Sequence, residues 1–108
     1  MRYSVDYYGP RVLEEVESWP SGILADYARV VELLMEFGPV LRMPHSRALG
    51  GGLFELRARG REGIGRALYC YGYGPRVVVL HAFVKGTRKT PVRDLDIARR
   101  RMKDVHHG

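Results

Sequence analysis

The 108-residue chain contains little of what several classes of protein require. Its single cysteine, Cys70, excludes an internal disulfide and a metal site built from several thiolates. Its apolar runs fall far short of the roughly 20 residues that a helix needs to cross a bilayer, so we expect no membrane partner. No signal peptide opens the sequence, and we therefore expect a cytoplasmic protein.

Histidine is also scarce, and its distribution does not indicate a metal centre. The four histidines, which have no metal-ligand spacing to cysteine or to acidic residues, are His45, His81, His106 and His107. Three consecutive glycines at 50–52 are not followed by the lysine and hydroxyl residue of a phosphate-binding loop, so they indicate a turn. We expect neither a metal ion nor a small-molecule cofactor.

Positive charge is what the chain has in excess, and it is unevenly distributed. The net charge is +6, from 18 lysines and arginines against 12 acidic residues. Residues 1–38 contain three basic and seven acidic side chains, whereas residues 39–108 contain fifteen basic and five acidic ones. A basic surface attracts polyanions such as RNA, DNA or an acidic protein, although solvated surface charge is the ordinary alternative. The distribution predicts an acidic helical layer and a basic working face.

The length is that of a single domain, which we place at residues 1–108. The first part of the chain predicts a strand at Tyr3–Tyr8 and a short helix at Arg11–Trp19. Apolar residues at steps of three and four from Leu24 to Met35 predict an amphipathic helix. A glycine followed by a proline, at positions 38 and 39, ends that helix.

The rest of the chain predicts a connection, three strands with short turns, and a closing helix. The connection is Val40–Gly52, and the strands are Leu53–Arg57, Ile64–Tyr71 and Arg76–Lys85. The closing helix begins with Thr90 and Pro91, and its apolar face extends from Leu95 to Val105. The expected order is β-α-α-β-β-β-α. This order is typical of an α+β domain, and we expect an antiparallel sheet with helices on one face and a partly open second face.

The last predicted strand contains the residues of greatest chemical interest. Successive side chains of a strand point to opposite faces of the sheet. One alternating set, which we expect in the core, is Val78, Leu80, Ala82 and Val84. His81, Phe83 and Lys85 belong to the other set, so an imidazole, an aromatic ring and an ammonium group would share the open face. This combination suits a phosphate backbone with stacked bases.

Four stretches of the chain resemble the HigB-like, phage-related branch of the RelE/ParE toxin superfamily. Gly51–Arg57 is similar to the GGLWELR stretch of that branch, and Arg66–Tyr69 is similar to its RVLY strand. Ala98–Asp104 resembles the end of its closing helix. The most specific match is Val79–Pro91, which resembles the signature LLHGFxKKTQKTP.

The resemblance implies the compact RelE-like fold and a toxin that pairs with a small antitoxin, often a helix-turn-helix protein. It also implies the usual activity of RelE and HigB relatives, which cleave messenger RNA on the translating ribosome. ParE-type members of the superfamily poison DNA gyrase instead. Two departures from the signature bear on the chemistry: Gly86 replaces the second of its two consecutive cations, and Arg88 stands where glutamine is usual.

Metal-free RNA cleavage needs a base for the 2′-hydroxyl, cations for the charged pentacoordinate phosphate and an acid for the leaving 5′-oxygen. His81 suits either proton role, because an imidazole titrates near neutral pH. The candidates for clamping the phosphate are Lys85, Arg66 and Arg57. Arg57 can instead pair with Glu55, and Arg66 reaches the open face only if Tyr69 belongs to the core.

Further residues are candidates for RNA binding, namely Phe83, Lys89, Arg88, Arg99 and Arg100. The ring of Phe83 can stack on a base or simply cover part of the sheet. The run of arginines from Arg99 is ordinary helix surface in one reading and a contact with ribosomal RNA or antitoxin in the other.

The leading hypothesis is the toxin of a type II toxin–antitoxin pair, a metal-independent endonuclease that cleaves messenger RNA on the ribosome. Its partners would be a helix-turn-helix antitoxin, the message and the ribosome. The first alternative is a ParE-like poison or binding module that acts on gyrase or another nucleoprotein without cleaving RNA. The second is an inactive relative that only binds an antitoxin.

Overall fold

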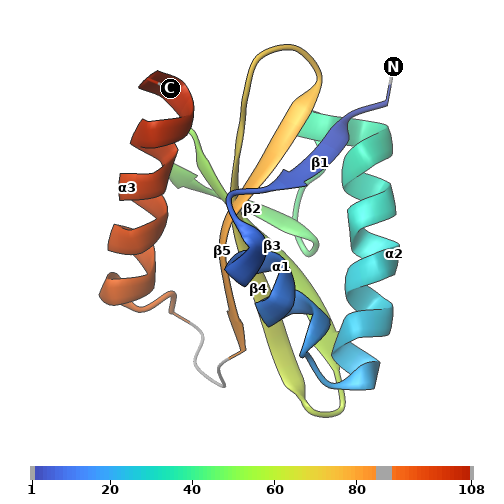
Figure 1. The fold of residues 1–108 in the computed structure, drawn as a ribbon. Helices are drawn as coiled ribbons and strands as arrows, with labels where there is room; N and C mark the ends of the chain where they lie inside the picture. Colours follow the sequence, from blue (N-terminus) through green and yellow to red (C-terminus); the bar gives the residue numbers. More distant parts are fainter. Residues whose placement is uncertain (1, 85–88, 108) are drawn as a thin grey trace.

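The computed structural model describes residues 2–84 and 89–107 and shows a five-stranded sheet with helices on both sides (Figure 1). The elements are β1 (Ser4–Tyr7), α1 (Pro10–Glu17), α2 (Ser21–Phe37), the 3-10 turn η1 (Gly38–Val40), β2 (Ser46–Gly50), β3 (Leu53–Gly60), β4 (Gly63–Tyr71), β5 (Arg76–Val84) and α3 (Val92–His107). The strand order across the sheet is β1-β5-β4-β3-β2. None of the helices in the described ranges has the length and apolar character needed to span a membrane.

Local sequence explains where the first two helices begin and end. Pro10 occupies the first turn of α1, where a missing backbone N–H costs nothing. Gly38 ends α2 with a positive φ of 54°. A Cβ atom at this position would lie 2.3 Å from the ring of Tyr3, so both the backbone conformation and the space require glycine.

Helices α1 and α2 cover one face of the sheet with an apolar core. The buried residues of the two helices and of the turn that joins them are Val12, Val16, Trp19, Ile23, Tyr27, Val30 and Leu34. This cluster includes Leu56, Tyr69 and Val79 of the sheet. Burial of a large apolar side chain is worth about 1.5–3 kcal/mol, so this layer supplies much of the stability of the fold.

The closing helix α3 lies on the opposite face, where Ala98 and Met102 share a second core cluster with Leu53, Leu68 and Leu80. The expectation that the helices lie on one face and leave the other partly open is therefore wrong. The physical reason is that β4 and β5 have apolar side chains on both faces. A strand of this kind needs a cover on each side.

The α+β class and the predicted order of elements are confirmed, with one strand added and one pairing corrected. The connection predicted at Val40–Gly52 contains β2, which pairs with β3 at the edge of the sheet. This strand has only five residues and a break in register, so its alternation is weak in the sequence. The sheet is mixed rather than antiparallel, because β1 runs parallel to β5.

An irregularity in β5 changes which of its side chains share a face. Leu68 of β4 pairs with His81, but Tyr69 pairs with Val79, so Leu80 is an extra residue in the strand. Val79 and Ala82 consequently belong to the α1/α2 cluster, whereas Leu80 belongs to the α3 cluster. The predicted core set of Val78, Leu80, Ala82 and Val84 is therefore divided between the two faces. A bulge of this kind is invisible to a simple alternation rule.

Candidate active site

Two rows of side chains cross the face of the sheet that α3 covers. In one row, Arg57 of β3 lies opposite Arg66 of β4, which lies opposite Phe83 of β5. In the next row the aligned residues are Glu55, Leu68 and His81. Side chains directly opposite on neighbouring strands have Cβ atoms about 4.5–5.5 Å apart. The sheet thus brings His81, Phe83 and two of the predicted cations together on one face.

Glu55 is the centre of the charged part of this site. Its carboxylate is fully buried and accepts a hydrogen bond of 2.8 Å from Nε of Arg57. Nη1 of Arg66 and Nη2 of Arg47 lie 3.9 and 4.0 Å from the same carboxylate. We call Arg47, Arg57 and Arg66 the arginine cluster. The hydroxyl of Thr90, just before α3, also donates a hydrogen bond to Glu55. A buried carboxylate needs this many partners to offset its lost hydration.

Arg66 lies on the α3 side, as expected if Tyr69 is in the core, and Tyr69 is indeed only 1% exposed. The Arg66 side chain is itself only 1% exposed, however. Burial lowers the pKa of its guanidinium, and the charge of Glu55 partly offsets this effect. Arg57 makes the pairing with Glu55 that the sequence left as an alternative, and its side chain is 11% exposed.

His81 forms a dyad with Asp94 of α3. Its Nε2 atom lies 2.7 Å from Oδ1 of Asp94, and the two side chains are 18% and 10% exposed. With Asp94 ionised, Nε2 carries the proton and donates it to this bond, which leaves Nδ1 as an acceptor. The His81 ring also lies 5.7 Å from the ring of Phe83. The carboxylate therefore fixes both the orientation and the tautomer of the imidazole.

The sequence predicts His81 on an open face, but its side chain is mostly covered. It lines a small hollow of about 160 Å³ between α1 and α3. The other lining residues are Arg11, Val12, Glu15, Ala82 and Arg101. An imidazole held by a carboxylate on α3 and reached through a hollow with two arginines is able to exchange a proton with a bound anion.

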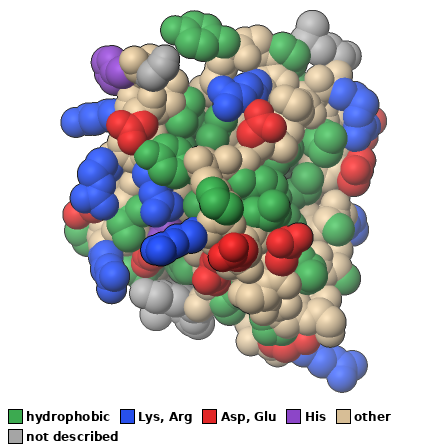
Figure 2. Space-filling view, in the orientation of Figure 1, with side chains coloured by type: hydrophobic (Ala, Val, Ile, Leu, Met, Phe, Trp, Pro, Cys, Tyr) green, Lys and Arg blue, Asp and Glu red, His purple; other side chains and the backbone are tan. Residues whose placement is uncertain are grey.

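Polar contacts fasten α3 to the sheet along its length. Arg99 donates hydrogen bonds of 3.0 and 3.1 Å to the backbone carbonyl oxygens of Leu49 and Gly50. Arg101 donates one of 2.7 Å to the carbonyl oxygen of Leu80. Arg99 is thus engaged in holding the helix, and only Arg100 of the two helical candidates for RNA binding is exposed. Figure 2 shows lysine and arginine side chains gathered on the α3 side of the molecule.

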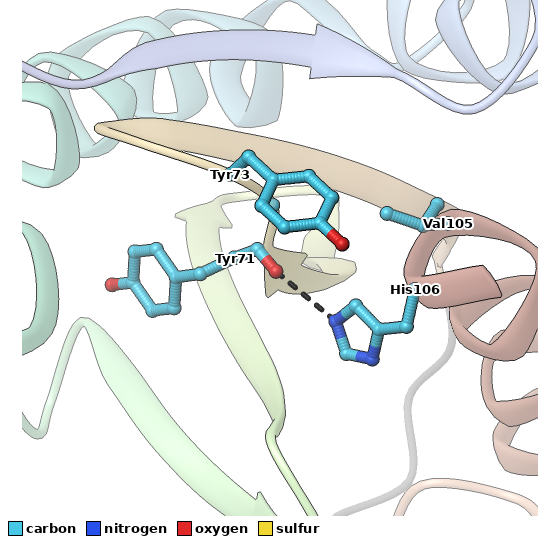
Figure 3. A pocket seen from close by; sticks show the side chains of 5 residues that line it. Tyr71, Tyr73, Val105 and His106 are labelled. Carbon is cyan, nitrogen blue, oxygen red and sulfur yellow. Dashed lines mark hydrogen bonds between the residues drawn. The ribbon is translucent and has the colours of Figure 1, made fainter. Parts of the chain in front are cut away.

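A second hollow lies at the far end of α3, away from the dyad (Figure 3). It has a volume of about 280 Å³ and is lined by Tyr71, Gly72, Tyr73, Val105 and His106. Nε2 of His106 donates a hydrogen bond of 3.1 Å to the carbonyl oxygen of Tyr71. This contact ties the last turn of α3, which continues to His107, to the end of β4.

The remaining predicted residues are only partly accounted for. Lys85 and Arg88 lie outside the described residues. Lys89 is exposed and precedes α3. Phe83 is 7% exposed and belongs to the α3 cluster. Of the two roles considered for its ring, base stacking and covering part of the sheet, this burial favours the second. Cys70 is buried as a small apolar residue, and burial raises the pKa of its thiol to about 11.

Sequence reasoning missed three residues of the site, Arg47, Thr90 as a partner of Glu55, and Asp94. Asp94 is an acidic residue in the first turn of a helix, a position that usually indicates no more than a favourable contact with the helix dipole. Its burial was the missing information. No group of three or more metal-binding side chains occurs among residues 2–84 and 89–107.

Comparisons with known proteins agree with this architecture. The family model described as "Phage derived protein Gp49-like (DUF891)" matches residues 14–103. A chain of the crystal structure of the archaeal RelE–RelB complex from Pyrococcus horikoshii OT3 superposes with a TM-score of 0.57. The two chains are 24% identical, and the match covers 82% of this chain and 100% of the archaeal one. No curated protein matches the sequence significantly. The chain therefore belongs to the phage-derived Gp49-like family and has the RelE fold that the resemblance implies.

Proposed function

We propose that the protein is the toxin of a type II toxin–antitoxin pair and that it cleaves messenger RNA on the translating ribosome without a metal ion. Family and fold support the toxin assignment. The observation that carries the proposed chemistry is the placement of the His81–Asp94 dyad beside the arginine cluster, on adjacent rows of the same face. Proton transfer and stabilisation of phosphate charge are what metal-free RNA cleavage requires.

In this reaction the 2′-oxygen of one nucleotide attacks the adjacent phosphorus, a 2′,3′-cyclic phosphate forms, and the bond to the 5′-oxygen breaks. Nδ1 of His81 accepts the proton of the 2′-hydroxyl, and the imidazolium that forms is stabilised by Asp94. Arg57, whose side chain is more exposed than that of Arg66 opposite it, holds the non-bridging phosphate oxygens. The buried Arg66 adds positive potential beneath the phosphate. The leaving 5′-oxygen takes a proton from Lys85 or from water, and the imidazolium of His81 then releases its extra proton to solvent.

Translation of a defined message in a purified system tests this proposal. The wild-type protein should produce discrete 3′ ends that primer extension detects, and Arg57→Ala should remove at least nine tenths of that cleavage. Arg29→Ala is the matched control, because Arg29 is an exposed arginine on α2 whose salt bridge to Asp26 lies on the surface. An intact message with the wild-type protein, or equal cleavage by the two variants, would refute the assignment.

One observation favours a function without cleavage. The side chains of Arg66 and His81 are 1% and 18% exposed, which is little for residues that must contact RNA. A ParE-like poison of gyrase or another nucleoprotein, or an inactive relative that only binds an antitoxin, would need no such contact. Inhibition of DNA supercoiling without loss of RNA would support the former, and an absence of growth arrest with a folded protein would support the latter.

The proposed partner is a small antitoxin, which we expect to be a helix-turn-helix protein encoded next to this chain. The excess of positive charge on the chain suits an acidic partner. Co-expression with the neighbouring reading frame followed by affinity purification tests this expectation. Recovery of the chain alone, in several salt concentrations, would contradict it.

A further inference from the structure

An exposed apolar surface lies where α2 ends and the chain turns into β2. Phe37, Val40 and Met43 are 46%, 71% and 56% exposed, and they fall within seven consecutive residues. We call these three residues the apolar shoulder. Single exposed apolar residues are ordinary, but three large ones within one short segment indicate a surface that a partner can cover.

A hollow of about 360 Å³ adjoins the apolar shoulder. Its lining residues are Pro39, Leu41, Arg42, Met43, Ser46, Arg47, Ala48 and Phe54. The lining is apolar apart from one hydroxyl and two arginines, and it includes no acidic residue. The hollow also lies at β2, the last strand of the sheet, whose outer edge has no neighbouring strand in the described part of the chain. A groove beside a sheet edge is a common place for an extended peptide to bind.

We propose that this surface binds an extended acidic segment of the antitoxin, an inference that rests on the toxin assignment proposed above. An apolar side chain of the segment fills the hollow beside Met43 and Phe54, and its carboxylates pair with Arg42 and Arg47. Arg47 is suited to this role because its side chain is 41% exposed and approaches Glu55 only to 4.0 Å, beyond hydrogen-bond distance.

The composition of the surface favours this occupant over two others. RNA would bind the arginines, but it would leave the aliphatic side chains of Val40, Leu41 and Met43 without a complementary apolar contact. A second copy of this chain in a two-fold contact would bring Arg42 and Arg47 against the same arginines of its partner, and no acidic lining residue would offset the repulsion. An acidic peptide with apolar anchors satisfies both parts of the surface.

Binding of the antitoxin segment in the hollow would also regulate the candidate active site, because Arg47 belongs to the hollow and to the arginine cluster. It lines the hollow and it is one of the cations around Glu55. In addition, the backbone N–H of Arg57 donates a hydrogen bond of 2.9 Å to the carbonyl oxygen of His45, in the segment that leads into β2. A partner carboxylate on Arg47 removes one cation from the phosphate site and fixes the edge strand next to Arg57.

Equilibrium binding of the purified full-length chain to the protein encoded by the neighbouring reading frame tests the proposal. Val40→Asp should weaken binding at least tenfold, because it places a charge in the apolar contact and repels acidic groups. Arg42→Glu should weaken it by a similar factor, and the loss should shrink at high salt. Val92→Asp is the matched control: Val92 is also 71% exposed but lies on α3, so binding should stay unchanged.

The outcomes of this experiment test the docking surface independently of the proposed RNA cleavage. Unchanged binding by Val40→Asp and Arg42→Glu, or no binding by the wild-type chain, overturns the proposal. Loss of self-association in Val40→Asp, measured by analytical ultracentrifugation, overturns it in favour of a second copy, and loss of RNA cleavage by the free variant overturns it in favour of RNA. If the wild-type chain binds but cleaves no message, the proposed reaction fails while the docking surface stands. Thermal unfolding of each variant excludes misfolding as the cause.

Discussion

The two faces of the sheet are covered in different ways. The α1/α2 face has a continuous apolar core, with a hydrogen bond of 2.7 Å between the hydroxyls of Tyr7 and Tyr27 among its few polar contacts. On the α3 face, apolar residues alternate with buried charge, and hydrogen bonds from Arg99 and Arg101 help to hold the helix. The net contribution of a hydrogen bond to stability is about 0.5–1.5 kcal/mol, which is less than that of one large buried apolar side chain. One face is therefore a scaffold, and the other combines a weaker attachment with the chemistry.

Removal of Glu55 should be the most damaging single change. Glu55→Ala leaves Arg57 and Arg66 buried without their common carboxylate, and the free energy of unfolding should fall by about 3–5 kcal/mol. Denaturant unfolding measures this value. Glu17→Ala, on the exposed side of α1, should change it by less than about 0.5 kcal/mol. Equal stability of the two variants would mean that the buried charges are not coupled as described.

Truncation of one core residue on each face should expose the difference between them directly. Leu34 is 0% exposed on the α2 side and Met102 is 9% exposed on α3. Both changes to alanine should lower the free energy of unfolding within the usual range of about 2–5 kcal/mol, with Leu34→Ala near the upper end and Met102→Ala near the lower. Chemical denaturation of the two variants under one condition gives the ranking. A larger loss for Met102→Ala would reverse our assignment of scaffold and site.

Asp94→Asn should loosen α3 without affecting the rest of the protein. The change keeps the size of the side chain but removes the charge that strengthens its bond to His81. We expect a loss of about 1–2 kcal/mol in the local stability of α3, because charge-assisted hydrogen bonds contribute about 1.5–3 kcal/mol and this one is partly exposed. Hydrogen exchange should accelerate in α3 while amides of α2 keep their protection. Uniform acceleration across both helices would show that the faces unfold together.

The smallest expected effect is a loss of stability at alkaline pH that comes from Cys70. Near neutral pH the thiol is protonated in both the folded and the unfolded chain, so stability does not depend on pH through this group. Burial raises the pKa of Cys70 from 9.0 to about 11, so the folded chain keeps its thiol proton where the unfolded chain has lost it. The stabilising contribution of the neutral thiol is complete below about pH 9 and is lost as the pH rises toward 11. Cys70→Ala should remove this part of the pH dependence, since the buried tyrosines are common to both chains. If the free energy of unfolding falls with the same slope between pH 9 and 11 in the wild type and in Cys70→Ala, Cys70 is not buried as described.

The sequence predicts the scaffold well because its signals are local. The predicted strand at Ile64–Tyr71 corresponds to β4, and the glycine and proline after Phe37 end α2 as expected. These features depend on glycine and proline, which end helices and strands, and on the spacing of apolar residues within one element. The same local logic places His81, Arg57 and Arg66 on strands.

The sequence predicts the site less completely, because its decisive contacts join distant residues. Thr90 is 35 positions from Glu55, and Asp94 is 13 positions from His81. The amphipathic pattern of α3 shows that the helix has an apolar face but not which side of the sheet it covers. The bulge at Leu80 likewise depends on pairing with β4, so no pattern within β5 alone could place His81 and Phe83 on the α3 side.

The rate at which the protein cleaves a message bound to ribosomes, compared between wild type and His81→Ala, tests the central claim most directly. A proton-transfer role for His81 predicts a fall of about 10²–10⁴-fold, because that is the usual contribution of a positioned general base. The variant loses the bond to Asp94, so its thermal unfolding should show a loss of stability similar to that of Asp94→Asn, and the two rates are compared at a temperature at which both proteins are folded. Equal rates of cleavage by the two folded proteins would contradict the account of this site.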